Sequence, residues 1–193
     1  MLGFILLVLA AVVLTRWLMR LKPTSTQKHG SPRLQQAEKY AARLFREKHY
    51  LPAEKAYLDV LKLDHRHADA YAHLGAIYSI QHNYPDAIES FVLAARYAPS
   101  ATAYQHLGQV YLENKNTVKS VAAYEKSIMF EPSAARYAGL SKALERLGSN
   151  RKAVEAQEKA VELDDSDRYR GELAKLYAQY GRPEQAAQIQ NTD

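Results

Sequence analysis

The sequence contains no cysteine. Disulfides, thiol catalysis and Cys-ligated zinc or iron–sulfur sites are therefore excluded. The chain also lacks a glycine-rich phosphate-binding loop and a Gly-x-Ser-x-Gly nucleophile elbow. No cofactor, metal site or catalytic residue is expected from these absences. The absence of cysteine does not decide the compartment, because it is compatible with either side of a membrane.

Acidic residues are absent before Glu38, whereas five Lys and Arg residues lie in the first 36 positions. These five account for the whole net charge of +5, because the remaining 21 basic residues are balanced by 21 acidic ones. A sequence pI of about 9.2 is often a sign of nucleic-acid binding. Here the excess is confined to one short segment, so a nucleic-acid partner is not expected.

Charge of either sign is missing from Leu2 to Thr15, and Arg16, Trp17, Arg20 and Lys22 follow. A helix extended to Met19 would be about 27 Å long, close to the ~30 Å hydrocarbon core of a bilayer. Arg16 could then reach the headgroups and Trp17 the interface. We predict an uncleaved transmembrane signal-anchor helix with a basic flank over residues 1–21, with these four residues as its interfacial anchors.

Two alternatives for this segment are a cleaved signal peptide and a buried helix. A signal peptide needs a positive residue before the apolar run and a small-residue cleavage site after it, and neither is present. All nearby Lys and Arg residues follow the run, so the positive-inside rule predicts an outside N-terminus and a cytoplasmic remainder. We expect a single-pass protein of a bacterial inner membrane, with a polar linker over residues 22–33.

A repeat of 33–34 residues occupies most of the remaining chain. Small residues follow Leu at 33-residue steps, in Leu74-Gly75, Leu107-Gly108, Leu140-Ser141 and Leu173-Ala174. Tyr40-Ala41 lies one 34-residue step upstream. Self-similarity at this period indicates a solenoid of stacked units. Catalysis is not expected, because a solenoid encloses little volume from which water is excluded.

Within one unit, the spacing predicts two helices joined by a short turn. Tyr71, Leu74 and Tyr78 lie on one helical face, and Ala87 and Phe91 begin a second. The unit resembles the tetratricopeptide repeat, whose pattern is aromatic–Leu–Gly–Tyr…Ala…Phe…Ala…Pro. Residues that match this pattern in full are Tyr71, Leu74, Gly75, Tyr78, Ala87, Phe91, Ala94 and Pro99, and one unit later Tyr104, Leu107, Gly108, Tyr111, Ser120, Tyr124, Ser127 and Pro132.

The resemblance predicts an all-α, TPR-type α-solenoid over residues 34–190, preceded by the transmembrane helix. About four and a half helix–turn–helix repeats are expected, at about 34–67, 68–100, 101–133, 134–166 and 167–190. The first junction is one residue longer than the later ones, so we expect shorter turns at the later junctions and a slightly altered superhelical pitch. Gln157 replaces an aromatic residue and is expected in a C-terminal half that grows more polar toward solvent.

Members of this family bind peptides or partner helices in a concave groove lined by the first helices of successive repeats. The resemblance implies that this groove displays Lys39, Asp69, His73, Gln105, His106, Gln109, Lys142 and Arg146. His73 and His106 lie one unit apart and are predicted to be hydrogen-bonding rungs for an extended peptide. The alternative is a row of exposed polar residues without a ligand. His65 and His67 do not share a helical face, so we interpret them as a solvated turn and not a metal pair.

The sequence therefore predicts a membrane-anchored TPR scaffold or adaptor without enzymatic activity. Its expected partners are proteins or peptides at the cytoplasmic face, during assembly or regulation of a membrane-associated complex, together with lipid around the N-terminal helix. The alternatives are a protein like a mitochondrial outer-membrane import receptor, and a regulatory subunit of a membrane enzyme.

Overall fold

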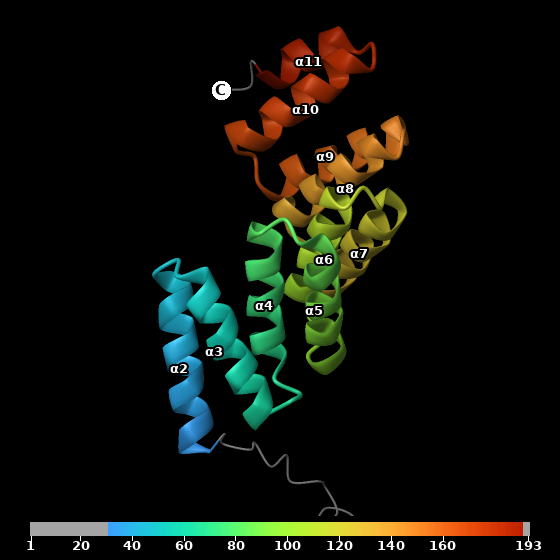
Figure 1. Cartoon of the computed structure of the whole chain (residues 1–193). Coiled ribbons are helices and arrows are strands. Elements are labelled where there is room, and N and C mark those ends of the chain that lie inside the picture. The colour runs from blue at the N-terminus through green and yellow to red at the C-terminus, as the bar shows by residue number, and fades with distance from the viewer. Residues whose placement is uncertain (1–30, 191–193) are drawn as a thin grey trace, which may run out of the picture. The chain divides into compact units, whose positions relative to one another are not determined.

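A computed structural model describes residues 31–190 of the chain, and these residues form ten helices (Figure 1). Within the described part of the chain, residues 37–190 belong to one compact unit. The helices are α2 (Pro32–Arg46), α3 (Tyr50–Leu63), α4 (Ala68–Ile80), α5 (Tyr84–Tyr97), α6 (Ala101–Glu113), α7 (Thr117–Phe130), α8 (Ala134–Arg146), α9 (Asn150–Leu163), α10 (Asp167–Gln179) and α11 (Pro183–Gln190). Ser31 begins α2, because its Oγ accepts a hydrogen bond from the Leu34 N–H at 3.3 Å.

The predicted transmembrane helix, residues 1–21, lies outside the described residues, as does most of the predicted linker. Its proposed anchors, Arg16, Trp17, Arg20 and Lys22, lie outside them as well. Among the helices that the structure does describe, none combines the length and apolar character needed to span a bilayer.

The even-numbered helices are the first members of each repeat, here called A helices, and the odd-numbered ones are the B helices. From α4 onward each A helix packs on the B helix that follows it, and each B helix packs on the next A helix. Figure 1 shows this succession from α4 to α11. The core therefore runs along the stacked helices, but each helix pair buries its apolar face only against the pairs next to it.

Small residues set how closely the two helices of a repeat approach. A Cβ atom placed on Gly75 would lie 2.9 Å from ring carbons of Phe91, and one on Gly108 would lie 2.7 Å from a ring carbon of Tyr124. Ala87 is fully buried in the same layer. These residues occupy the small and aromatic positions of the repeat pattern. The pattern therefore arises because an aromatic ring of one helix packs directly against the backbone of the other.

Each A helix ends in the same way. Lys48, His82, Lys115, Gly148 and Gly181 all have a left-handed backbone with φ between 59° and 79°. In α4 the Asn83 N–H donates to the Tyr78 carbonyl at 2.8 Å, and the His82 N–H donates to the Ser79 carbonyl at 3.1 Å. This is a Schellman motif, which satisfies the last carbonyls of the helix and reverses the chain.

The turns between repeats shorten after the first one, as predicted. Four residues separate α3 from α4, and three separate each later pair. Ser100 and Ser133 cap the following A helices, since their Oγ atoms accept backbone N–H bonds at 3.2 Å and 3.4 Å. At the longer first junction His67 has this role, and its Nδ1 accepts from the Ala70 N–H at 3.1 Å.

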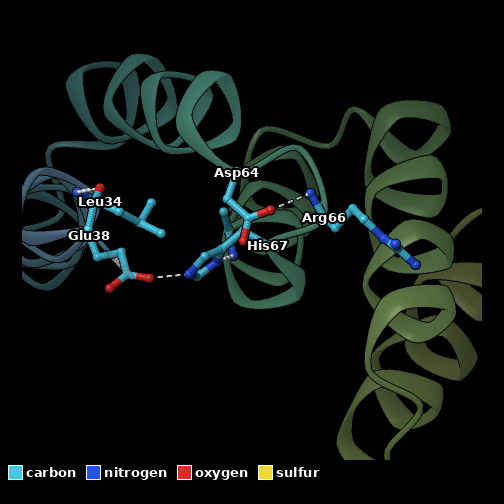
Figure 2. A network of polar contacts seen from close by, with 7 residues as sticks. Leu34, Glu38, Asp64, Arg66 and His67 are labelled. Carbon is cyan, nitrogen blue, oxygen red and sulfur yellow. Dashed lines mark hydrogen bonds and ion pairs between the residues drawn. The ribbon is translucent and has the colours of Figure 1, made fainter. Parts of the chain in front are cut away.

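The interpretation of His67 as a residue of a solvated turn is wrong. Its side chain is only 17% exposed, and its Nε2 pairs with Glu38 on α2 (Figure 2). Because Nδ1 accepts a backbone proton, the neutral ring carries its proton on Nε2 and donates it to the Glu38 carboxylate. His67 thus caps α4 and contacts α2 through the same ring.

The expectation for Gln157 is also wrong. Its side chain is buried, with 2% exposure, and does not face solvent. Its Nε2 donates to the Tyr169 carbonyl at 3.1 Å, across the junction between α9 and α10. A buried amide is tolerated here because a neighbouring backbone carbonyl accepts its hydrogen bond.

Candidate binding site

The two histidines predicted to line the groove both lie on A helices and both stack on an aromatic ring of the preceding B helix. The His73 and Tyr57 ring centroids are 4.7 Å apart with an interplanar angle of 11°. The His106 and Phe91 centroids are 5.1 Å apart at 15°. The two pairs are related by the repeat, so one face of each imidazole is covered by protein in both.

Burial lowers the pKa of both His73 and His106 below the usual value for histidine. The cause is desolvation, which disfavours the charged imidazolium. Both rings are therefore neutral at pH 7, and each has one donor and one acceptor nitrogen. Each ring is half-buried, and one of its faces packs on an aromatic ring of the protein. The sequence predicted hydrogen bonding to a peptide for these two histidines but did not predict this stacking.

The row of histidines stops after two members for a steric reason. One repeat later the equivalent residue is Gly139, and a Cβ atom placed there would lie 2.3 Å from a ring carbon of Tyr124. The Tyr124 ring occupies the space that an imidazole takes in the two preceding repeats. The sequence gives a sign of this in the glycine at a position where the earlier repeats have histidine.

A pocket of about 420 Å³ opens between α4, α5 and α6. Helix α6 contributes His106, Gln109, Val110 and Glu113 to its lining. Residues that complete the lining are Ala76, Ser79 and Ile80 from α4, His82 from the turn, and Tyr84 and Phe91 from α5. Pockets of this size are typical of binding sites for small ligands. Two of the predicted groove residues, His106 and Gln109, are brought together here.

A second, smaller cavity of about 130 Å³ lies between α8, α9 and α10. It occupies the same place in the repeat, two units further on. Its lining includes Lys142, Glu145, Glu172 and Lys175, and the Lys175 Nζ lies 3.4 Å from the Glu172 carboxylate. The two cavities therefore share a position but differ in chemistry, since the first is largely apolar and aromatic and the second is ionic.

The other predicted groove residues are spread along the A helices. Lys39 and Asp69 lie on α2 and α4, and Gln105 is half-buried on α6. Lys142 lies in the smaller cavity, whereas Arg146 lines neither and donates from Nη1 to the Leu112 carbonyl at 3.0 Å. The A helices do carry all eight residues, and three of them, His106, Gln109 and Lys142, line one of the two cavities described above.

Sequence reasoning missed the other eight lining residues of the larger pocket, and four of those on helices have polar or aromatic side chains that bear on binding. Ser79 and Glu113 lie on the A helices, and Tyr84 and Phe91 come from a B helix. Phe91 was assigned to packing because it matches the repeat pattern, although its ring also faces the pocket. Ser79 could have been found by comparing the repeats position by position, since its neighbours in register are Phe45 and Leu112.

No group of three or more His, Asp or Glu side chains among residues 31–190 is placed to hold a metal ion.

The fold and the repeated sites define a TPR-type α-solenoid. The tetratricopeptide repeat family profile matches residues 101–133 and 134–167. These matches agree with the helix pairs α6–α7 and α8–α9. The predicted tetratricopeptide repeats and the all-α solenoid are thereby confirmed.

Solved structures of repeat proteins are similar over most of the chain. MamA from residue 41 onward, from Desulfovibrio magneticus RS-1, has a TM-score of 0.77 at 19% identity, with 83% of this chain and 92% of that chain covered. YrrB, described as a TPR protein with an unusual peptide-binding site, has a TM-score of 0.69 at 18% identity, with 85% and 84% covered.

A thermophilic TPR protein from Thermus thermophilus, TTC0263, is also similar, with a TM-score of 0.62, 18% identity and coverage of 81% and 87%. At such low identities these likenesses concern the fold alone. No match was found among curated protein sequences.

Proposed function

We propose that this chain is a non-catalytic scaffold that binds a partner protein through its A-helix face, defined here as the surface formed by α4, α6, α8 and α10. The observation that carries the proposal is the pocket between α4, α5 and α6, where His106 and Gln109 meet aromatic and aliphatic side chains. Concave apolar sites with few polar groups are typical of recognition surfaces.

The pattern of charges on this face supports a protein partner. Lys142 has no ion-pair partner within the described residues, and Arg146 bonds to a backbone carbonyl. Polar and charged groups on the same face as an apolar pocket are typical of the rim that protein interfaces have around their buried centre. The likeness of the fold to TPR proteins, one of them described by its peptide-binding site, points in the same direction.

Site-specific photo-crosslinking in cells tests this proposal. A photoreactive residue is introduced into the full chain at Gln109 or Lys142 on the A-helix face, and at Lys152 on α9 as a control that is exposed away from both cavities. We expect the same covalent adduct from the first two positions and none from Lys152. Adducts of equal yield from all three positions, or from none, would contradict binding through this face.

We further propose that residues 1–21 anchor the scaffold in a membrane, with the repeats on the cytoplasmic side. The uncharged run Leu2–Thr15 and the basic residues after it support this proposal. The anchor would raise the local concentration of any partner at the membrane. Assembly or regulation of a membrane complex is the role that fits such a scaffold.

Fractionation and protease protection test the anchor separately. We expect the full chain to stay with membranes after a carbonate wash, and the repeats to resist protease added outside intact spheroplasts. Digestion of the repeats while the membrane is intact would indicate the opposite topology, with the repeats outside. Release of the chain by the wash would contradict the membrane anchor but would leave the proposed binding face untested by this experiment.

A further inference from the structure

One position of the A helix lies at the space beside the next repeat, and its side chain differs between repeats. The residue at this position is Phe45 in α2, Ser79 in α4, Leu112 in α6 and Glu145 in α8, at successive repeat steps. Glu145 lines the smaller, ionic cavity. The Phe45 ring lies 5.0 Å from the His73 ring and 5.9 Å from the Tyr50 ring, centroid to centroid. Leu112 is buried, with 6% exposure. In both neighbouring repeats the protein thus covers this space with a large apolar side chain of its own.

Ser79 leaves the equivalent space open. Its Oγ donates to the Gly75 carbonyl of its own helix at 2.7 Å, so the hydroxyl is already partnered. The pocket of about 420 Å³ lies where the rings or branched chains of the neighbours would be. The pocket therefore lies at the place that a Phe or Leu side chain takes in the neighbouring repeats.

The walls of this pocket suit an apolar guest. Phe91 and His106 stack at 5.1 Å to form one aromatic wall. At the mouth, Tyr84 and His82 are joined by a hydrogen bond of 3.0 Å between Oη and Nδ1, and their rings meet edge to face. Aromatic rings placed in this way offer both faces and edges to a further ring.

The charge at the pocket indicates which guests are disfavoured. Glu113 is the one carboxylate among the lining residues, and no Lys or Arg lines the pocket. A guest carboxylate would lose hydration here and meet a like charge, whereas a basic residue beside the anchor would meet an opposite charge.

We propose that this pocket is an anchor site for a partner peptide, and that it takes one large apolar side chain, Phe, Tyr or Leu, in the place that Phe45 and Leu112 fill in the neighbouring repeats. The inference rests on the proposed function and specifies the partner's chemistry. The guest segment carries neutral or basic residues next to its anchor. Its apolar side chain supplies the buried centre of the contact, and the rest of the A-helix face supplies the polar rim.

Peptide selection followed by binding measurements tests the anchor site. Random 12-residue peptides displayed on phage are selected on the purified full chain, and the enriched sequences are synthesised. Their affinities are measured by fluorescence anisotropy for the wild type, Ser79→Phe and Ser79→Ala. Phenylalanine at this position reproduces Phe45 and should occupy the part of the pocket beside α4, whereas Ser79→Ala keeps it open and serves as the matched control.

We expect a shared Phe, Tyr or Leu in the selected peptides, with Lys or Arg enriched beside it. Ser79→Phe should weaken binding at least about tenfold, and Ser79→Ala should change it less than about threefold. A peptide whose anchor is changed to Ala should lose about as much affinity on the wild type. This last measurement keeps the test decisive even if Ser79→Phe folds poorly, which circular dichroism would reveal.

The failures are distinguishable. Equal affinity for Ser79→Phe and Ser79→Ala, or selected peptides that share an acidic anchor, would overturn the anchor site while leaving binding to the A-helix face intact. Peptides that bind wild type, Ser79→Phe and a Gln109→Glu, Lys142→Glu double variant equally well would show that the face itself is not used. That result would overturn the proposed function together with the inference.

Discussion

At the scale of single residues, small side chains are as informative as large ones in this protein. Gly75 and Gly108 lie against the aromatic rings of their own B helices, and Gly139 lies against Tyr124 from the preceding repeat. An added methyl group at any of them would meet a ring that is itself held by packing. Glycine at these positions therefore allows an A helix to pack closely against an aromatic ring of a B helix.

We predict that Gly108→Ala lowers the free energy of unfolding by about 1–3 kcal/mol, because the new Cβ overlaps the Tyr124 ring. Gly171→Ala is the matched control in α10. An added Cβ there has no atom within 4 Å, and alanine favours the helix, so we expect a gain of about 0.5–1 kcal/mol. Urea unfolding followed by circular dichroism measures both. Equal effects of the two substitutions would contradict the packing argument.

The buried histidines predict how stability depends on pH. His73 and His106 have folded-state pKa values lowered by burial, below the value of about 6.5 for an unfolded chain. The unfolded state therefore binds protons first as the pH falls, so this contribution to stability is complete above pH 6.5 and decreases as the pH falls toward the folded pKa values.

Unfolding in urea at pH 7.5 and 5.5 would measure this loss. We expect a smaller loss between the two pH values for a His73→Gln, His106→Gln double variant than for the wild type. An unchanged dependence in the double variant would assign the effect to other groups.

At the scale of the element, the ends of the A helices follow one geometry with varied residues. The left-handed position holds glycine in the last two helix pairs but Lys48, His82 and Lys115 in the first three. A side chain in this conformation costs free energy because its Cβ approaches the carbonyl, whereas glycine adopts it freely. The Schellman hydrogen bonds are formed in either case.

We predict that Lys115→Gly stabilises the protein by about 0.5–1 kcal/mol, because it removes this backbone cost. Gly148→Lys places the reverse change at the same position one repeat later, and it should destabilise by a similar amount. Nothing lies within 4 Å of a Cβ atom placed on Gly148, so the effect would come from the backbone alone. Thermal unfolding of the two variants compares them, and a shift in the same direction for both would contradict the prediction.

His67 shows how an element boundary can be predicted while the role of its residue is not. The repeat spacing predicts a turn at residues 64–67, and the structure has one there. The residue that Ser100 and Ser133 match is here a histidine, which both caps α4 and reaches Glu38. The order of residues along the chain cannot supply this second contact, because it joins residues 29 positions apart.

At the scale of the whole solenoid, stability depends on having neighbours on both sides. Helices α5 to α8 pack on helices before and after them, whereas α11 contacts α10 and has no following helix within the described residues. Repeat arrays add their stability from such nearest-neighbour contacts. Local opening is expected where one set of these contacts is missing.

Hydrogen exchange should report this difference directly. We predict that amides of α11 exchange fastest among helices α4 to α11, and that those of α5 to α8 exchange slowest. Mass spectrometry of peptic fragments at several exchange times would measure the rates. Protection of α11 equal to that of α6 would contradict the nearest-neighbour account.

The repeat, the helix pairs, the shorter later turns and the helices that carry the predicted groove residues could all be predicted from the sequence. These features depend on residue spacing, and a helix converts spacing into a face through its 3.6-residue period. For the site, the sequence predicted which helices carry its residues, since all eight predicted residues lie on A helices. Three of them, His106, Gln109 and Lys142, line cavities.

The positions of the cavities could not be predicted from the sequence and became known from the packing of the helices. The pocket depends on Ser79 being small where Phe45 and Leu112 are large, and on Phe91 and Tyr84 from another helix closing its side. It likewise decided that the histidines stack on rings and that Gln157 is buried. Whether a side chain is buried or a cavity is left open depends on how side chains from different helices fill the space between them. These helices are separated in the sequence, so residue spacing within one helix does not predict the result.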